Sequence, residues 1–172
     1  MHNAGMTSDA AQDPHAEFEF LQRLHAATPR VLVTPALIAL NVAVFVAMIA
    51  LGVPVTGGHA DDYLRFGANF GPLTTGGEWW RTLTCTFVHA GLLHLAFNLW
   101  ALWDGGRLAE RLFGNAWFAA LYLFAGVAGS FASMLWRNDA ISVGASGAVF
   151  GVFGALLACT LRARGSIPPA VT

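Results

Sequence analysis

The chain alternates between segments that carry charges and long stretches that carry none. Four uncharged stretches stand out, at residues 31–53, 82–103, 112–136 and 140–161, and each is 22 to 25 residues long. As helices they would measure roughly 33–38 Å, whereas the hydrocarbon core of a bilayer is about 30 Å thick. The pattern therefore predicts an all-α polytopic membrane protein with one transmembrane helix in each stretch.

The segments at either end complete the predicted organisation. Residues 1–30 are polar and end in the short amphipathic piece "HAEFEFLQRLHAA" before Pro29. The first uncharged stretch is longer than the apolar core of about 7–15 residues in a cleaved signal peptide, so we expect it to be retained. We predict a tail over 1–30, a membrane domain over 31–161, and the start of a loop over 162–172.

Residues 54–81 join the first two stretches, and a connection of this length is rarely without structure. The segment mixes glycines with aromatic residues, namely Tyr63, Phe66, Phe70, Trp79 and Trp80. Aromatic side chains among polar neighbours are typical of the membrane–water boundary. We predict a partly helical loop in the outer leaflet; a simple aromatic anchor is the alternative.

The charged residues indicate which way the chain is oriented in the membrane and which partners do not suit it. The chain has no lysine, and with a cytoplasmic N-terminus six arginines lie inside (Arg23, Arg30, Arg107, Arg111, Arg162 and Arg164) and three outside (Arg65, Arg81 and Arg137). This bias favours a cytoplasmic N-terminus. A net charge of −1 argues against nucleic acid as a partner. The composition, rich in arginine, alanine and glycine, suggests a bacterial inner membrane.

Small residues recur at helical spacing in the last two stretches. Gly126 and Ser130 are four residues apart, as are Gly147 and Gly151, with Gly154 three residues further on. Helices in lipid gain little from apolar burial, so small residues that let backbones approach supply much of the packing contact. We expect the last two helices to pack closely along these residues.

Four polar residues within the stretches are considered for chemistry. His94 and Asn98 are four residues apart and share a helix face, whereas His89 is rotated well away from that face. Ser146 lies near the start of the last stretch, beside glycine. Each residue alone is explained by interhelical hydrogen bonding or packing. Together they could supply a nucleophile and two oxyanion donors.

Other kinds of site find less support in the sequence. A metal site is disfavoured because no Cys, Asp or Glu converges on the histidines and the HExxH pattern is missing. The hydrolase pattern G-x-S-x-G is also missing, since position 148 is alanine. A small transporter or channel is the weakest alternative, because no acidic residue or charge pair marks an ion path.

Two longer segments carry a family resemblance. "GEWWRTLTCTFVHAGLLHLAFNLWALWDGGRLAERLFG" followed by "GASGAVFGVFGA", over about residues 77–158, resembles the rhomboid intramembrane serine proteases. The resemblance implies a rhomboid-like helical bundle in which Ser146 is the nucleophile. His94 and Asn98, with the Ser146 backbone N–H, would stabilise the oxyanion. His89 would be structural or would retain water near the site.

The resemblance also implies supporting residues and a set of partners. Trp80 and Arg81 would brace the first loop and Glu110 the inner end of the bundle, while Gly144 and Gly147 would leave room around the serine. Rhomboid proteases cleave transmembrane protein substrates within the lipid bilayer, near the outer face, and need no metal or organic cofactor.

One departure from the family pattern changes the expectation. The family's general base is a histidine on a later helix, and no histidine follows His94 here. The four predicted helices are also fewer than the six of the family core. We therefore expect a truncated rhomboid protease that cleaves poorly without this base. The alternative is a non-catalytic rhomboid-like protein that binds membrane helices.

Overall fold

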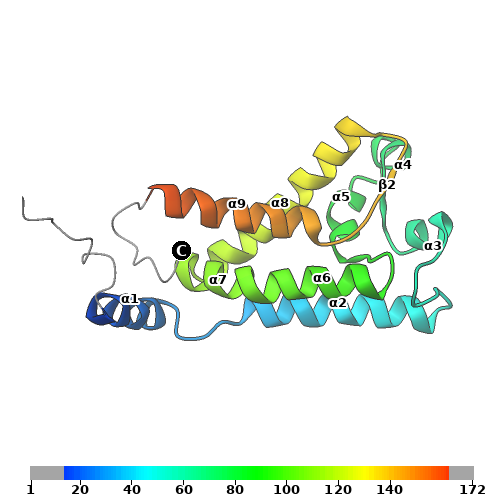
Figure 1. The fold of residues 1–172 in the computed structure, drawn as a ribbon. Coiled ribbons are helices and arrows are strands. Elements are labelled where there is room, and N and C mark those ends of the chain that lie inside the picture. The colour runs from blue at the N-terminus through cyan, green and yellow to red at the C-terminus, as the bar shows by residue number, and fades with distance from the viewer. Residues whose placement is uncertain (1–13, 163–172) are drawn as a thin grey trace, which may run out of the picture.

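A computed structural model describes residues 14–162 of the chain as a helical protein with one two-stranded sheet (Figure 1). The predictions for residues 1–13 and 163–172 lie outside the described residues. In chain order the elements are α1 (Pro14–Ala27), α2 (Val33–Ala50), α3 (Ala60–Arg65), β1 (Asn69–Phe70), α4 (Gly71–Thr75), α5 (Arg81–Thr84), η2 (Cys85–Phe87), α6 (Leu92–Ala101), η3 (Leu102–Gly106), α7 (Arg107–Phe113), α8 (Asn115–Trp136), β2 (Ile141–Ser142) and α9 (Ser146–Arg162).

Two helices in the described part of the chain, α2 and α8, are long and apolar enough to cross a membrane. A third candidate is the pair Arg81–Phe87 and Leu92–Phe113, which is bent by 94°. The 17 residues of α9 form a shorter apolar helix. Large apolar side chains on these helices point outward, including Leu135 at 90% exposure. This outward apolar surface is what lipid contact requires, because water would penalise it.

The predicted helix over 82–103 is not continuous. Residues 88–91 interrupt it, and α6 begins only after Gly91, which has a φ of +97°. The segment before α3 crosses this point, where the Leu92 N–H donates to the Val55 carbonyl at 2.9 Å. A Cβ atom on Gly91 would lie 2.8 Å from the Thr56 carbonyl oxygen. The break therefore needs a residue without a side chain.

The predicted helix over 140–161 begins later than expected. Ile141 and Ser142 form β2, which pairs antiparallel with β1, so Asn69 lies opposite Ser142 and Phe70 opposite Ile141. Ser146 is consequently the first residue of α9 and not a residue one turn into a helix. The pairing joins the loop between α2 and α5 to the segment that leads into α9.

The main contact between helices is the tight packing of α8 on α9, and α6 and α2 run side by side below α9 in Figure 1. Phe118 and Tyr122 of α8 are fully buried against Leu102, Ala145 and Ala148. Glycines permit the approach: a Cβ atom on Gly129 would lie 3.0 Å from the Cα atom of Gly147. Since lipid offers little hydrophobic driving force, such close contact supplies much of the attraction between helices.

Candidate functional site

Ser146 lies where the chain turns from β2 into α9, at the end of the bundle that also carries α3 and α4 (Figure 1). Gly144 makes this turn possible, because its φ of +105° is one that side chains rarely adopt. The Gly144 N–H donates to the Cys85 carbonyl at 2.9 Å, which ties the turn to η2. Ser146 itself is partly buried, and among the described residues its hydroxyl has no hydrogen-bond partner.

Two histidines contact this turn. The His94 imidazole packs on Gly144, where a Cβ atom would lie 2.5 Å from His94 Cε1. The fully buried His89 accepts a hydrogen bond at Nε2 from the Ala145 N–H at 3.4 Å. Its Nδ1 therefore carries the proton and faces the Phe87 carbonyl at 3.3 Å. The ring centroids of His89 and His94 are 5.2 Å apart.

His89 also lies elsewhere than the sequence predicts. The prediction rotates it away from His94 on a continuous helix, but His89 lies in the break before α6 and its ring faces His94. Gly91 is the sequence signal for this arrangement, because a glycine can end one helix and begin another. Asn98, by contrast, lies one turn after His94, as its spacing predicts, and is 6% exposed.

The structure brings some candidates together and leaves others apart. His89 and His94 both contact the 144–145 turn, and α6 contacts α9. The Asn98 side chain donates to the His94 carbonyl at 2.8 Å, within its own helix. Among the residues described, no hydrogen bond joins Asn98 or His94 to Ser146. The two histidines therefore contact the turn that precedes the serine, whereas Asn98 bonds within α6.

Gly147 and Gly151 extend the same contact along α9. A Cβ atom on Gly147 would lie 3.3 Å from the Gly129 Cα atom, and one on Gly151 would overlap the Cβ atom of Ala125. Gly147 and Gly151 thus face α8 as the spacing predicts, whereas Gly154, which the prediction groups with them, has nothing within 4 Å of its Cβ position. Gly147 and Gly151 set how near the first turn of α9 lies to the neighbouring helix.

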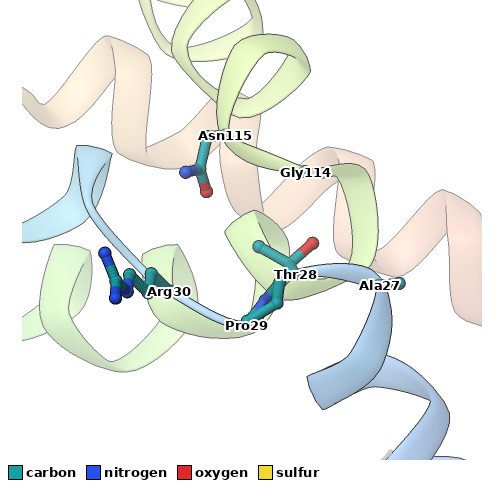
Figure 2. A pocket seen from close by; sticks show the side chains of 6 residues that line it. All are labelled: Ala27, Thr28, Pro29, Arg30, Gly114 and Asn115. Carbon is teal, nitrogen blue, oxygen red and sulfur yellow. The ribbon is translucent and has the colours of Figure 1, made fainter.

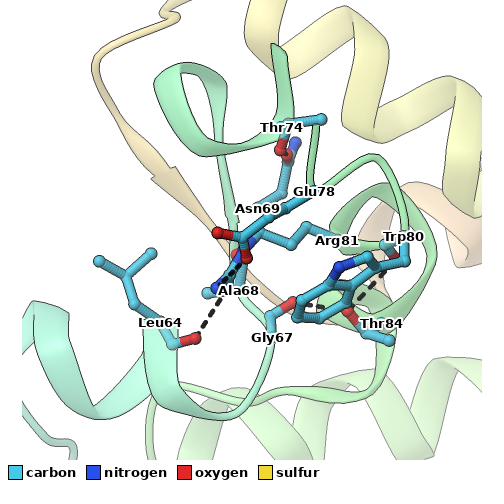
Figure 3. A network of polar contacts seen from close by, with 9 residues as sticks. All are labelled: Leu64, Gly67, Ala68, Asn69, Thr74, Glu78, Trp80, Arg81 and Thr84. Atoms are coloured by element: carbon cyan, nitrogen blue, oxygen red, sulfur yellow. Dashed lines mark hydrogen bonds and ion pairs between the residues drawn. The ribbon is translucent and has the colours of Figure 1, made fainter. Parts of the chain in front are cut away.

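Arg81 organises the loop between α2 and α5 (Figure 3). Its guanidinium donates to the Leu64 carbonyl at 2.7 Å and the Ala68 carbonyl at 3.0 Å, and it pairs with Glu78 at 2.7 Å. The Trp80 ring covers the guanidinium, with the Cζ atom of Arg81 4.6 Å from the ring centroid. The side chain is buried, so these bonds replace its hydration.

Asn69 is a buried residue of this loop that the sequence does not single out. Its side chain accepts a hydrogen bond from Thr74 at 2.7 Å and donates to the Ser130 carbonyl of α8 at 3.3 Å. Ser130 also donates to the Thr82 carbonyl at 2.7 Å. Because Asn69 is also opposite Ser142, it connects the loop, α8 and β2. Its partners are remote in sequence, so no local pattern marks it.

Glu110 holds the opposite end of the bundle. Although fully buried, its carboxylate accepts backbone N–H bonds from Leu32 and Val33 at 2.7 Å and from Thr34 at 2.8 Å. These donors belong to the start of α2, where N–H groups lack intrahelical partners and the helix dipole is positive. The carboxylate thus caps a helix that lies more than 70 residues before it in the chain.

The histidines do not belong to a metal cluster within the described range: residues 14–162 contain no group of three or more His, Cys, Asp or Glu side chains that could hold a metal ion. His89 and His94 contact the turn before α9.

The fold and the site define a multi-pass helical membrane protein in which two histidines pack on a glycine-containing turn before a serine. Comparison with known proteins gives the family: a model of the Rhomboid domain matches residues 76–172, more than half of the chain. The chain belongs to the rhomboid family.

Three relatives illustrate the similarity. The chain is 45% identical over 106 residues to Rhomboid protease GluP of Bacillus subtilis (strain 168), covering 62% of this chain and 21% of the relative. It is 39% identical over 105 residues to RHOMBOID-like protein 7 of Arabidopsis thaliana, covering 60% and 34%. RHOMBOID-like protein 4 of the same plant is 46% identical over 82 residues, covering 48% and 21%. The chain thus spans about a fifth to a third of these relatives.

Proposed function

We propose that this chain carries the nucleophile and the oxyanion-stabilising groups of an intramembrane serine endopeptidase. The proposal assigns the nucleophile to Ser146 and oxyanion stabilisation to His94, Asn98 and the Ser146 backbone N–H. The observation that supports it most directly is the packing of His94 on Gly144, two residues before Ser146. That contact brings the donor-bearing face of α6 to the start of α9.

Attack of the Ser146 Oγ atom on a peptide carbonyl forms a tetrahedral intermediate whose oxygen bears negative charge. The first N–H groups of α9 lack intrahelical partners and lie at the positive end of the helix, so they suit this oxyanion. Asn98 uses one N–H on the His94 carbonyl and retains a second for donation. Donors preset around a developing charge lower the barrier because they need not reorganise.

The proton of the Ser146 hydroxyl needs an acceptor, and the proposal assigns none in this sequence. No histidine follows His94, and His89 already accepts the Ala145 N–H at its Nε2 atom. The residues here account for the attacking atom and for charge stabilisation, whereas proton removal is a separate requirement.

The substrate class follows from where Ser146 lies in the proposal. Apolar helices surround the site, so the peptide bonds that reach it belong to transmembrane proteins, cleaved near the outer face. The loop braced by Arg81 lies at the same end of the bundle and would control entry (Figure 1). The proposal includes a bacterial inner-membrane location with a cytoplasmic N-terminus, since six of nine arginines then lie inside.

The test is cleavage of a model transmembrane substrate in reconstituted membranes. We expect the unaltered chain to release product slowly and Ser146→Ala to release none. Ser142→Ala is the matched control, because it removes a hydroxyl from β2, four residues earlier, and should cleave as the unaltered chain does. Equal product from the chain with and without Ser146 would contradict the proposed enzyme.

A non-catalytic protein that binds membrane helices is the second candidate. It is favoured by the unpartnered Ser146 hydroxyl in the described structure. This candidate predicts that a transmembrane peptide crosslinks to the chain, and that the Ser146→Ala variant gives the same yield as the unaltered chain. Product that depends on Ser146 excludes it.

A further inference from the structure

Figure 2 shows a hollow of about 400 Å³. It lies beside the end of α1, away from the end of the bundle that carries α3 and α4 (Figure 1). Two links form it: the one between α1 and α2, and the one between α7 and α8. Its lining residues are Ala27, Thr28, Pro29, Arg30, Gly114 and Asn115. The volume falls within the range of about 300–1,000 Å³ that is usual for small-ligand sites. The rhomboid-type chemistry proposed above does not use this hollow.

The hollow has a positive character that the surrounding protein does not neutralise. Among residues 14–162, no carboxylate forms an ion pair with Arg30. Glu110, four residues before Gly114 of the lining, directs both carboxylate oxygens to the N–H groups at the start of α2. Arg111 lies beside the hollow, since its guanidinium donates to the Thr28 carbonyl at 3.2 Å. The arrangement favours an anionic ligand.

Asn115 gives an independent indication of a missing partner. Its side-chain oxygen is buried and has no hydrogen-bond partner in the described structure. A buried polar atom without a partner costs free energy, so native proteins rarely leave one. An amide turned over about its last bond would present its NH₂ group at the same place. The Thr28 hydroxyl already donates to the Arg111 carbonyl at 3.2 Å, so this NH₂ group is the one left to bind the oxygens of a ligand in the hollow.

The position of the hollow relative to the membrane-spanning helices indicates the source of such a ligand. α2 and α8, the two helices long enough to cross a membrane, both begin beside it. Trp117, the third residue of α8, is 76% exposed, and tryptophan is enriched at the level of lipid headgroups. Basic pockets between transmembrane helices at this level suit anionic headgroups. We propose that this hollow binds the phosphate of an anionic phospholipid, with Arg30 as its main contact.

The experiment measures thermal unfolding of the full chain in neutral detergent, because a ligand that binds only the folded state raises the midpoint. Three titrants are compared at equal concentration: short-chain phosphatidylglycerol, short-chain phosphatidylcholine and inorganic phosphate. We expect a saturable rise with phosphatidylglycerol only. An equal rise with phosphatidylcholine would overturn the proposal, and an equal rise with inorganic phosphate would overturn the lipid as its source.

Variants assign the effect to the hollow. Arg30→Ala should raise the apparent Kd for phosphatidylglycerol at least about tenfold, the loss expected for one charge-assisted contact. Arg30→Lys should retain part of the affinity, since it keeps the charge but not the fork of donors. Arg23→Ala is the matched control, an exposed arginine of α1 paired with Glu19. An unchanged Kd in Arg30→Ala, or equal losses in Arg30→Ala and Arg23→Ala, would overturn the assignment. Unfolding midpoints without titrant verify that each variant folds.

Discussion

The His94 imidazole lies against Gly144 so closely that a Cβ atom at position 144 would come within 2.5 Å of His94 Cε1 and 2.7 Å of Nε2. Gly144 also has a positive φ, so two separate requirements for glycine meet at one residue. The contact joins α6 to the turn before α9, and it places His94 against the segment that leads into Ser146.

Gly144→Ala should lower stability by more than backbone strain alone. Forcing a side chain into the left-handed region costs about 1–3 kcal/mol, and displacing the imidazole adds to this. Gly77→Ala is the matched control, because Gly77 has a φ of +120° and nothing within 4 Å of its Cβ position. Thermal unfolding in detergent measures both. Equal losses of stability in Gly144→Ala and Gly77→Ala would mean that His94 moves aside without a cost in free energy.

Removal of the Glu110 carboxylate should destabilise the bundle at the start of α2. Glu110→Ala leaves three backbone N–H groups without their partner, at about 1–3 kcal/mol each, so we expect a loss of at least about 3 kcal/mol. Glu110→Gln keeps one acceptor oxygen and should lose less. Glu19→Ala, at an exposed site, should change the unfolding midpoint little. Equal unfolding midpoints for Glu110→Ala and Glu19→Ala would contradict this prediction.

Arg81→Lys should loosen the loop between α2 and α5, although it preserves the charge. The guanidinium reaches two carbonyls and a carboxylate from one planar group, which a single ammonium cannot match. We expect trypsin to cleave after Arg65 several-fold faster in this variant. Arg137→Lys, in an exposed pair with Asp139, is the control and should be cleaved at the rate of the unaltered chain. An unchanged rate in Arg81→Lys would show that charge alone braces the loop.

The contact between α8 and α9 can be tested by exchanging two small residues. Gly151→Ala should destabilise the pair because the new Cβ atom overlaps that of Ala125. Adding Ala125→Gly should restore much of the loss, and the coupling appears in a double-mutant cycle of unfolding midpoints. Gly154→Ala, with nothing within 4 Å of its Cβ position, should be neutral or stabilising. Additive effects at positions 125 and 151 would contradict close packing there.

Patterns within one helix were predictable from the sequence. The spacing of His94 and Asn98 places them on one face, because α6 is regular over Leu92–Ala101. Hydropathy identified the apolar ranges that contain α2 and α8, since length and the lack of charge are sufficient for that. The small residues of α9 were grouped by spacing alone, and Gly147 and Gly151 do face α8.

Contacts between remote segments were not predictable in the same way. The apolar composition continues unchanged through residues 88–91, so hydropathy does not reveal the 94° bend or the position of His89. β2 forms because Asn69 and Phe70 are available as partners, and nothing local to Ile141 indicates them. Similarly, Glu110 is identifiable as an isolated acid, but its partners at residues 32–34 follow only from the assembled bundle.

The pairing of β1 with β2 constrains the order of events on the ribosome. Ile141 follows its partner Phe70 by 71 residues, and α8 lies between them. Because translation adds about 5–20 residues per second, Ile141 is synthesised roughly 4–14 seconds after Phe70. The loop that Arg81 braces therefore acquires its final anchor only after α8 has been translated.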